Sequence, residues 1–151
     1  MKQPPQIRCI LVPVDYSEAS SHALDYALFL AAPLGAKVDV VHVWDRPSFV
    51  PNDVNIESGG KRRSLGELVR ENSENEMLQF LEKHKSASGE LPAHRMLSGE
   101  PAAALVGELE RGAHDLVVLG TRGHTGLKHL LLGSVAEKLV RFSPVPVITV
   151  R

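Results

Sequence analysis

Short apolar runs recur along the chain, and longer segments with a different spacing separate them. The runs cover residues 9–14, 37–43, 92–97, 116–119 and 145–150. The second, KVDVVHV, is rich in β-branched residues, and the fourth, LVVL, is entirely apolar. Continuous apolar runs of this length are typical of strands that are covered on both faces of a sheet. They predict five strands, of which the third is the weakest.

The segments between these runs place apolar residues at helical spacing. The first helix is expected to end at Gly35, because glycine readily adopts the left-handed conformation found at helix C-termini. Further helices are expected from residue 64 to about residue 86, over 101–111 and over 134–141. The apolar face of the first helix consists of Ala23, Leu24, Ala27, Leu28, Ala31 and Leu34.

Two of the helix starts match the capping box, in which a serine is followed three residues later by glutamate. Ser64 with Glu67 marks the second helix, and Ser134 with Glu137 marks the fourth. The charged run KRRS that ends at Ser64 is expected to be a helix start facing water. Residues 44–60 have no sustained period, and we expect them to form a surface excursion.

Strands that alternate with helices predict an α/β protein with a parallel sheet and right-handed crossovers. We therefore expect a Rossmann-like, three-layer, doubly wound sheet of five parallel strands. The length of 151 residues fits one domain, residues 1–151, with a core of its own.

Composition excludes several classes of protein. Lys and Arg number 17 and Asp and Glu 18, so the chain lacks the positive charge that general nucleic-acid binding requires. The single cysteine, Cys9, excludes an internal disulfide and is typical of a reducing compartment. No apolar run approaches the ~20 residues of a membrane span. We expect a cytoplasmic protein with neither a nucleic-acid nor a membrane partner.

The loop after the fourth strand, GTRGHTGLKHLLLGS, carries the chemical information. Its glycines, including Gly120, Gly123 and Gly133, let backbone N–H groups approach an anion, and the following helix start adds free donors. The loop contains basic residues and no acidic one. These features predict a phosphate site, while a flexible loop ending in a helix cap remains the alternative. Neither a Walker A sequence nor a GxGxxG fingerprint is present.

The spacing Gly120-x2-Gly123-x9-Gly133-Ser134 is similar to the G-x2-G-x9-G-[ST] signature of the ATP-binding subgroup of the universal stress protein family. The segments ILVPVDYSEAS, DLVVLGTRG and SPVPVITVR resemble the corresponding segments of that family. The resemblance extends over essentially the whole chain. It implies strand order 3-2-1-4-5.

The resemblance also implies a nucleotide site. Asp15 is expected near the ribose or a metal-associated phosphate, with capping of the next helix as its alternative role. His42 is more typical of a core histidine with satisfied hydrogen bonds than of a ligand residue. The ligand is expected to be ATP (or AMP or ADP) with Mg²⁺, for which Asp15 is the one candidate protein ligand. The implied binding residues are Pro13, Val14, Asp15, Val41, Leu119, Gly120, Gly123, Gly133, Ser134 and Val135.

The resemblance implies a homodimeric regulatory or stress-response protein that binds ATP. Its two-fold contact is expected at the C-terminal edge strand, from Val145 to Val150, which is apolar and poorly protected against pairing. The alternative is a slow ATPase or a phosphotransferase that uses the same site, with Ser134 accepting phosphate. No general base for catalysis is evident in the sequence, so a binding protein is favoured over an enzyme.

Overall fold

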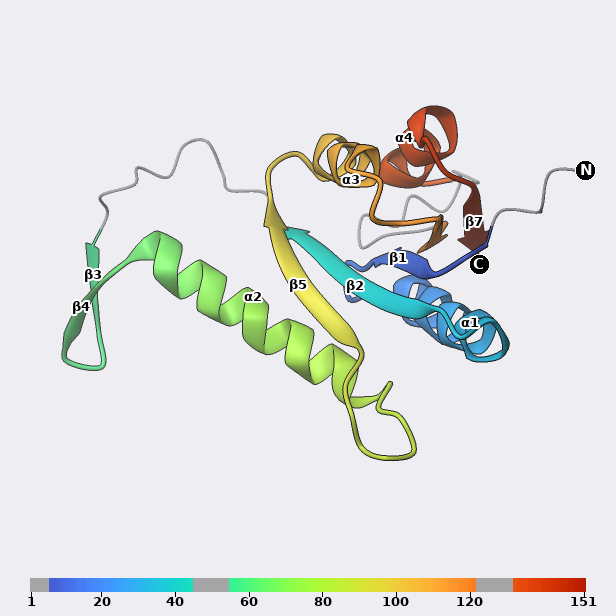
Figure 1. Cartoon of the computed structure of the whole chain (residues 1–151). Helices are drawn as coiled ribbons and strands as arrows, with labels where there is room; N and C mark the ends of the chain where they lie inside the picture. Colours follow the sequence, from blue (N-terminus) through green and yellow to red (C-terminus); the bar gives the residue numbers. More distant parts are fainter. Residues whose placement is uncertain (1–5, 45–54, 122–131) are drawn as a thin grey trace, which may run out of the picture.

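A parallel sheet of five strands forms the centre of the computed structural model, which describes residues 6–44, 55–121 and 132–151 (Figure 1). The strands lie in the order β5-β2-β1-β6-β7. Counted along the chain within this sheet, that is the expected order 3-2-1-4-5. The strands are β1 (Cys9–Pro13), β2 (Lys37–Trp44), β5 (Ala93–Ser98), β6 (Leu116–Gly120) and β7 (Val147–Val150).

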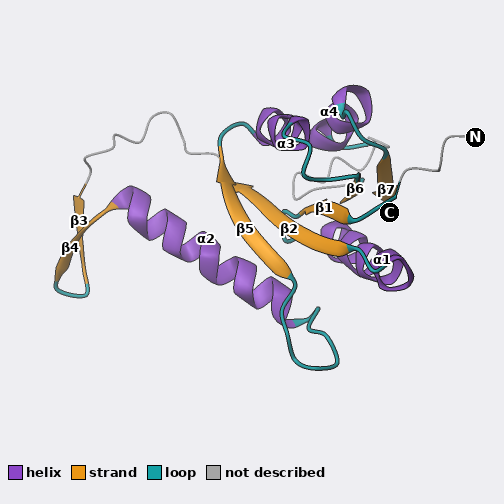
Figure 2. Ribbon diagram, in the orientation of Figure 1, coloured by secondary structure: helices purple, strands orange, loops and turns teal. Residues whose placement is uncertain are grey.

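Helices cover both faces of the sheet (Figure 2). Helices α1 (Glu18–Leu34) and α2 (Leu65–Glu82) contribute to one apolar core, and α3 (Pro101–Glu110) and α4 (Ser134–Phe142) contribute to the other. The α/β class with three layers is therefore confirmed. In the described parts of the chain, none of these helices is long and apolar enough to cross a membrane.

The alternation of side chains along β1 explains why its sequence is continuously apolar. Ile10 and Val12 point into the core beneath α1 and α2, whereas Leu11 points into the core beneath α3 and α4. All three side chains are fully buried. A strand at the centre of a doubly covered sheet has no face left for polar residues.

Helix starts follow the sequence pattern in α2 but not in α4. Ser64 caps α2: its hydroxyl accepts a hydrogen bond from the N–H of Glu67, and the Glu67 carboxylate accepts one from the N–H of Ser64. The expected capping box at Ser134 is wrong. Gly133 is the N-cap of α4, so Ser134 is already helical, and the N-cap residue makes no side-chain capping bond.

Residues 55–64 form a hairpin that the sequence reading missed. Strand β3 (Asn55–Ser58) pairs antiparallel with β4 (Lys61–Ser64), so the KRRS run is a strand and not the start of a helix. Gly59 and Gly60 join the strands, and both have positive φ. Two such residues make the tight turn whose twist matches that of a hairpin.

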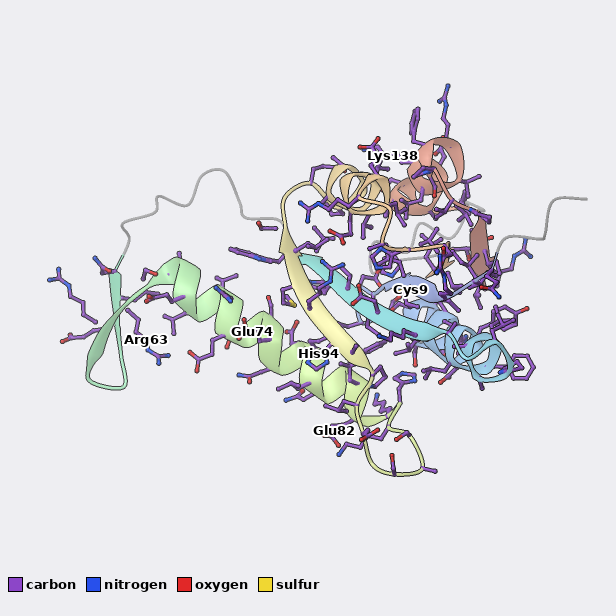
Figure 3. The ribbon with its side chains drawn as sticks, viewed as in Figure 1. Cys9, Arg63, Glu74, Glu82, His94 and Lys138 are labelled. Carbon is purple, nitrogen blue, oxygen red and sulfur yellow. The ribbon has the colours of Figure 1, made fainter. Side chains whose placement is uncertain are left out.

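Helix α2 carries charged side chains along its length, among them Glu74 and Glu82 (Figure 3).

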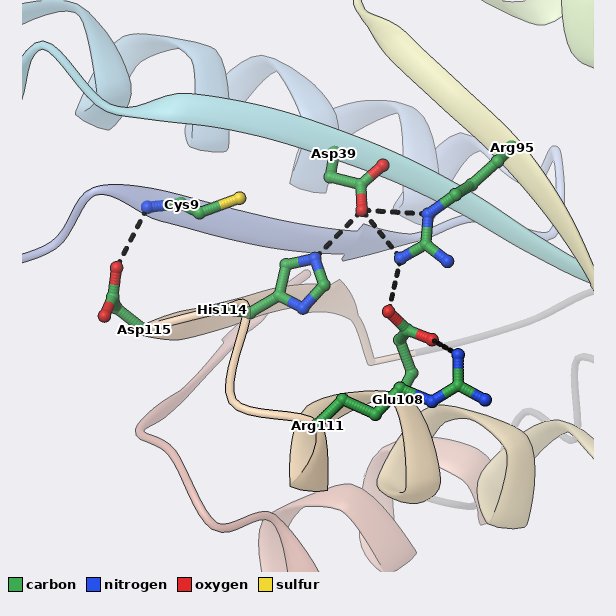
Figure 4. Close-up of polar contacts among 7 residues, drawn as sticks. All are labelled: Cys9, Asp39, Arg95, Glu108, Arg111, His114 and Asp115. Carbon is green, nitrogen blue, oxygen red and sulfur yellow. Dashed lines mark hydrogen bonds and ion pairs between the residues drawn. The ribbon is translucent and has the colours of Figure 1, made fainter.

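An ion-pair network holds α3 against the sheet (Figure 4). Arg95 on β5 donates to Asp39 on β2 at 2.9 Å and to Glu108 on α3 at 2.6 Å. Arg111 donates to the second oxygen of Glu108 at 3.2 Å, and the Nε2 of buried His114 lies 2.9 Å from Asp39. The hydrogen bond from Arg95 lowers the pKa of Glu108, although burial opposes this shift. The network lies at the C-terminal end of α3, away from Pro101 at its start.

The start of β1 is tied to the turn before β6. The carboxylate of Asp115 accepts hydrogen bonds from the N–H groups of Arg8 at 2.8 Å and Cys9 at 3.0 Å, and these bonds lower its pKa. The N–H of Asp115 in turn donates to the carbonyl of Cys9 at 2.9 Å. The starts of β1 and β6 are therefore held in a fixed position relative to each other.

Candidate functional site

A cavity of about 290 Å³ lies at the carboxyl ends of the central strands. Its volume is close to the lower limit of typical small-molecule sites. Strands β1 and β6 are neighbours here, but the chain leaves them toward opposite edges of the sheet. Ligands of open α/β sheets bind at such a reversal of strand order. The lining residues are Pro13, Val14, Asp15, Ser20, Val41, His42, Val43, Pro101, Leu105, Leu119, Gly120, Thr121, Gly133, Ser134, Val135 and Ala136.

Nine of the ten residues expected to bind nucleotide line this one cavity. Gly123 lies outside the described residues, as do the basic residues of the loop from Arg122 to Lys128. The nine come from four separate segments, which the parallel sheet brings to the same edge. They are Pro13, Val14, Asp15, Val41, Leu119, Gly120, Gly133, Ser134 and Val135.

Asp15 does not cap helix α1. The N-cap is Ser17, whose hydroxyl accepts from the N–H of Ser20 at 3.2 Å. The Asp15 carboxylate instead accepts hydrogen bonds from the N–H and the hydroxyl of Ser17. Among the described residues that line the cavity, Asp15 carries the only acidic side chain. Its carboxylate is thereby held at the end of β1, beside the cavity.

His42 is hydrogen-bonded through Nδ1 and also borders the cavity. Its Nδ1 lies 2.8 Å from the carbonyl of Val14, so Nδ1 carries the proton and donates. Tyr16 stacks on the His42 ring with centroids 4.4 Å apart, and Tyr16 also contacts Phe80 of α2. Tyr16 has a positive φ of 65°, and its hydroxyl donates to the carbonyl of Ser73. Burial, followed by the nearby charge of Glu76, raises the pKa of Tyr16.

The start of α4 borders the cavity with free backbone donors. The N–H of Gly133 donates to the carbonyl of Thr121 at 2.7 Å, and the first bond within the helix runs from Glu137 to Gly133. The N–H groups of the first turn, including those of Ser134 and Val135, have no carbonyl partner inside the helix. Such groups and the helix dipole favour an anion at this position.

The start of α3 also borders the cavity but is already capped. Glu100 accepts from the N–H of Ala103 at 2.7 Å, and Lys138 of α4 donates to Glu100 at 3.2 Å. The hydrogen bond from Ala103 lowers the pKa of Glu100. The anion-binding capacity at this end of the molecule is therefore concentrated on α4 rather than shared between the two helices.

Several cavity residues were not expected from the sequence. Thr121 directly follows Gly120, and its position after a strand was a usable signal. Pro101 and Leu105 belong to α3, whose start follows β5 and therefore lies at the same sheet edge. Ser20 of α1 and Ala136 of α4 also belong to this group. Across the described residues, no cluster of three His, Cys, Asp or Glu side chains is arranged to hold a metal ion.

The fold and this cavity together define a class of protein, the doubly wound α/β proteins with a ligand-sized cavity where the strand order reverses. The model of the universal stress protein family matches residues 6–151, and the chain belongs to that family. A universal stress protein of Methanocaldococcus jannaschii is 34% identical over 142 residues, covering 94% of this chain and 81% of the relative.

Solved structures agree with this assignment. A second universal stress protein of Methanocaldococcus jannaschii superimposes with a TM-score of 0.76 at 26% identity, covering 97% of this chain and 96% of the other. A universal stress protein solved in complex with cAMP has a TM-score of 0.60 at 26% identity, covering 97% and 99%. The latter protein is a family member that binds a cyclic adenine nucleotide.

Proposed function

We propose that this chain binds an adenine nucleotide, ATP or its di- or monophosphate, in the cavity at the ends of β1, β2 and β6. One observation carries the proposal: nine residues expected from the signature and its flanking segments line a single cavity. The uncapped start of α4 supplies donors for phosphate, and apolar residues such as Val41 and Leu119 supply walls for a base. The cAMP complex of a family member supports the same ligand class.

The cavity residues also fit a phosphate-bound cation. Mg²⁺ is usually held by one or two carboxylates together with phosphate oxygens and water. Asp15 is the one carboxylate that lines the cavity within the described residues, and it is oriented by Ser17. Asp15 would hold the cation, which in turn would neutralise the charge of a triphosphate.

The proposal includes a homodimer formed through the C-terminal edge of the sheet. Strand β7 pairs with β6 on one side and is the last strand in the sheet order. Val140 and Phe142 at the end of α4 are 54% and 59% exposed. An unpaired apolar edge of this kind favours pairing with a second copy across a two-fold axis. The protein would then act as a stress-response module whose state depends on bound nucleotide.

The test uses a substitution that should preserve the helix and exclude phosphate. In Ser134→Asp, the new carboxylate at the start of α4 interacts favourably with the helix dipole and so stabilises the helix. The same negative charge repels an anion from the free N–H groups. Calorimetric titration of the variant with ATP and Mg²⁺ should show affinity at least tenfold below that of the unchanged protein. Ser134→Asn, which adds no charge, is the matched control.

Equal affinity in both variants would refute the position of the phosphates. Failure of the unchanged protein to bind ATP, ADP or AMP would refute the function itself. Turnover with Mg²⁺ separates a binding protein from the slow ATPase or phosphotransferase. Many product molecules per site would favour the enzyme.

A further inference from the structure

The hydroxyl of Thr121 is a buried polar group that has no hydrogen-bond partner among the described residues. The residue is 4% exposed, and within the described parts of the chain its Oγ1 has no hydrogen bond. The residue lines the cavity next to Gly120. Buried hydroxyls are normally paired, because leaving one unpaired sacrifices its hydration without compensation.

Two hydrogen bonds hold the backbone of Thr121 in place. Its N–H donates to the carbonyl of Val150 at 2.8 Å, and its carbonyl accepts from Gly133 at 2.7 Å. Both bonds belong to the frame of the site, since one joins β6 to β7 and the other places the start of α4. The residue is therefore held in the cavity wall next to that helix start.

We propose that the Thr121 hydroxyl donates a hydrogen bond to a phosphate oxygen of the bound nucleotide, beside the free N–H groups of α4. This inference rests on the proposed function and adds a residue that the glycine signature does not contain. A threonine hydroxyl supplies one donor, and an ionised phosphate oxygen is purely an acceptor. The ligand would thus pair with a hydroxyl that has no partner within residues 6–44, 55–121 and 132–151.

The test replaces the hydroxyl by a group of the same shape. Thr121→Val removes the donor and keeps the volume, whereas Thr121→Ser keeps the donor and removes a methyl group. AMP and adenosine are titrated calorimetrically into each protein. We expect Thr121→Val to bind AMP about tenfold more weakly, a loss typical of one hydrogen bond to a charged group. Its affinity for adenosine should be unchanged, and Thr121→Ser should bind AMP nearly as the unchanged protein does.

The nucleotide-free proteins give a second readout. Because valine has no hydroxyl to leave unpaired, the melting temperature of Thr121→Val without ligand should equal or exceed that of the unchanged protein. A hydroxyl with a merely structural role would instead give a lower melting temperature. Thr121→Ala provides a second hydroxyl deletion in case valine disturbs folding.

The outcomes separate this inference from the function on which it rests. Normal AMP binding by both Thr121→Val and Thr121→Ala overturns the role of the hydroxyl and leaves nucleotide binding intact. Equal losses for AMP and adenosine overturn the phosphate contact. If the unchanged protein binds neither compound nor ADP nor ATP, the proposed function falls and this inference falls with it.

Discussion

A side chain at Gly120 would collide with the backbone of Ala19, because a Cβ built at residue 120 lies 2.7 Å from the carbonyl carbon of Ala19 and 2.8 Å from its oxygen. The end of β6 therefore packs directly on the first turn of α1. This glycine of the signature is needed for packing, whether or not a ligand is present.

Gly120→Ala should consequently lower stability without nucleotide. We expect a loss of about 2–3 kcal/mol in the free energy of unfolding, since the methyl group meets backbone rather than a movable side chain. Urea denaturation of the ligand-free protein measures it. Gly107→Ala in α3 is the control, because a Cβ there has nothing within 4 Å and should stabilise the helix by about 0.5–1 kcal/mol. Equal effects at the two glycines would contradict the packing argument.

The Arg95–Glu108 pair should make stability depend on acid pH. Because the Arg95 hydrogen bond holds the pKa of Glu108 below its ordinary 4.5, the charged pair stabilises the fold above that value. This stability should be lost as the pH falls from 4.5 through the lowered pKa. Glu108→Gln should flatten the unfolding free energy across this window and cost about 2–3 kcal/mol at pH 7.

Denaturation curves recorded between pH 3 and pH 7 test the Glu108 prediction. The control is Glu82→Gln, since Glu82 pairs with Lys85 at the surface, where its side chain is 55% exposed. A surface pair of this kind contributes little, about 0–1 kcal/mol. If the unfolding free energy of Glu108→Gln keeps its full dependence on acid pH, this dependence arises from other carboxylates.

His84 should stabilise the packing of the end of α2 against α1. Its buried ring bonds Asp25 through Nδ1 at 2.8 Å and Ser21 through Nε2 at 3.0 Å. His84→Leu removes both bonds and should cost about 1–3 kcal/mol of unfolding free energy. His94→Leu is the comparison, because His94 is exposed and bonds only the neighbouring carbonyl of Pro92 among the described residues. Losses of the same size would show that the two contacts to α1 contribute nothing.

The proposed dimer edge can be tested at Thr149. This residue is exposed on β7, so a charge there leaves the cores intact, whereas Val147 packs against buried residues. In a two-fold pairing of β7 strands, Thr149→Asp brings two like charges together and should weaken self-association at least tenfold. Sedimentation velocity measures it, with Thr149→Val as the uncharged control. An unchanged dimer would place the contact elsewhere.

The sequence predicted the sheet well because its signal is repeated along the chain. In β1, successive apolar residues pack into one core or the other, so the apolar run is continuous and predicts a strand clearly. The hairpin was missed because Gly59 and Gly60 look like loop composition unless their flanks are recognised as strands. The capping pattern placed the N-cap of α4 at Ser134, one residue too late. The N-cap is Gly133, which has no side chain with which to cap the helix.

The lining of the cavity was predicted where the motif and its flanking segments contain the residues, and it was missed where only burial reveals them. The resemblance located Asp15 and Ser134, which lie in separate segments and meet only through the sheet. The sequence around Thr121 does not show that its hydroxyl is buried without a partner among the described residues, because this burial depends on how β6, β7 and α4 assemble. The polar residues Asp39 and Arg95, both within strands, were an unused signal for a buried ion pair.

The hydrogen bond between the Thr121 carbonyl and the Gly133 N–H fixes both ends of segment 122–132 to the frame of the protein. This bond joins the end of β6 to the start of α4 directly, in addition to the chain between them. The first turn of α4 therefore keeps its position relative to β6 and to β1, the strand paired with it, and the wall of the cavity is set by the sheet itself.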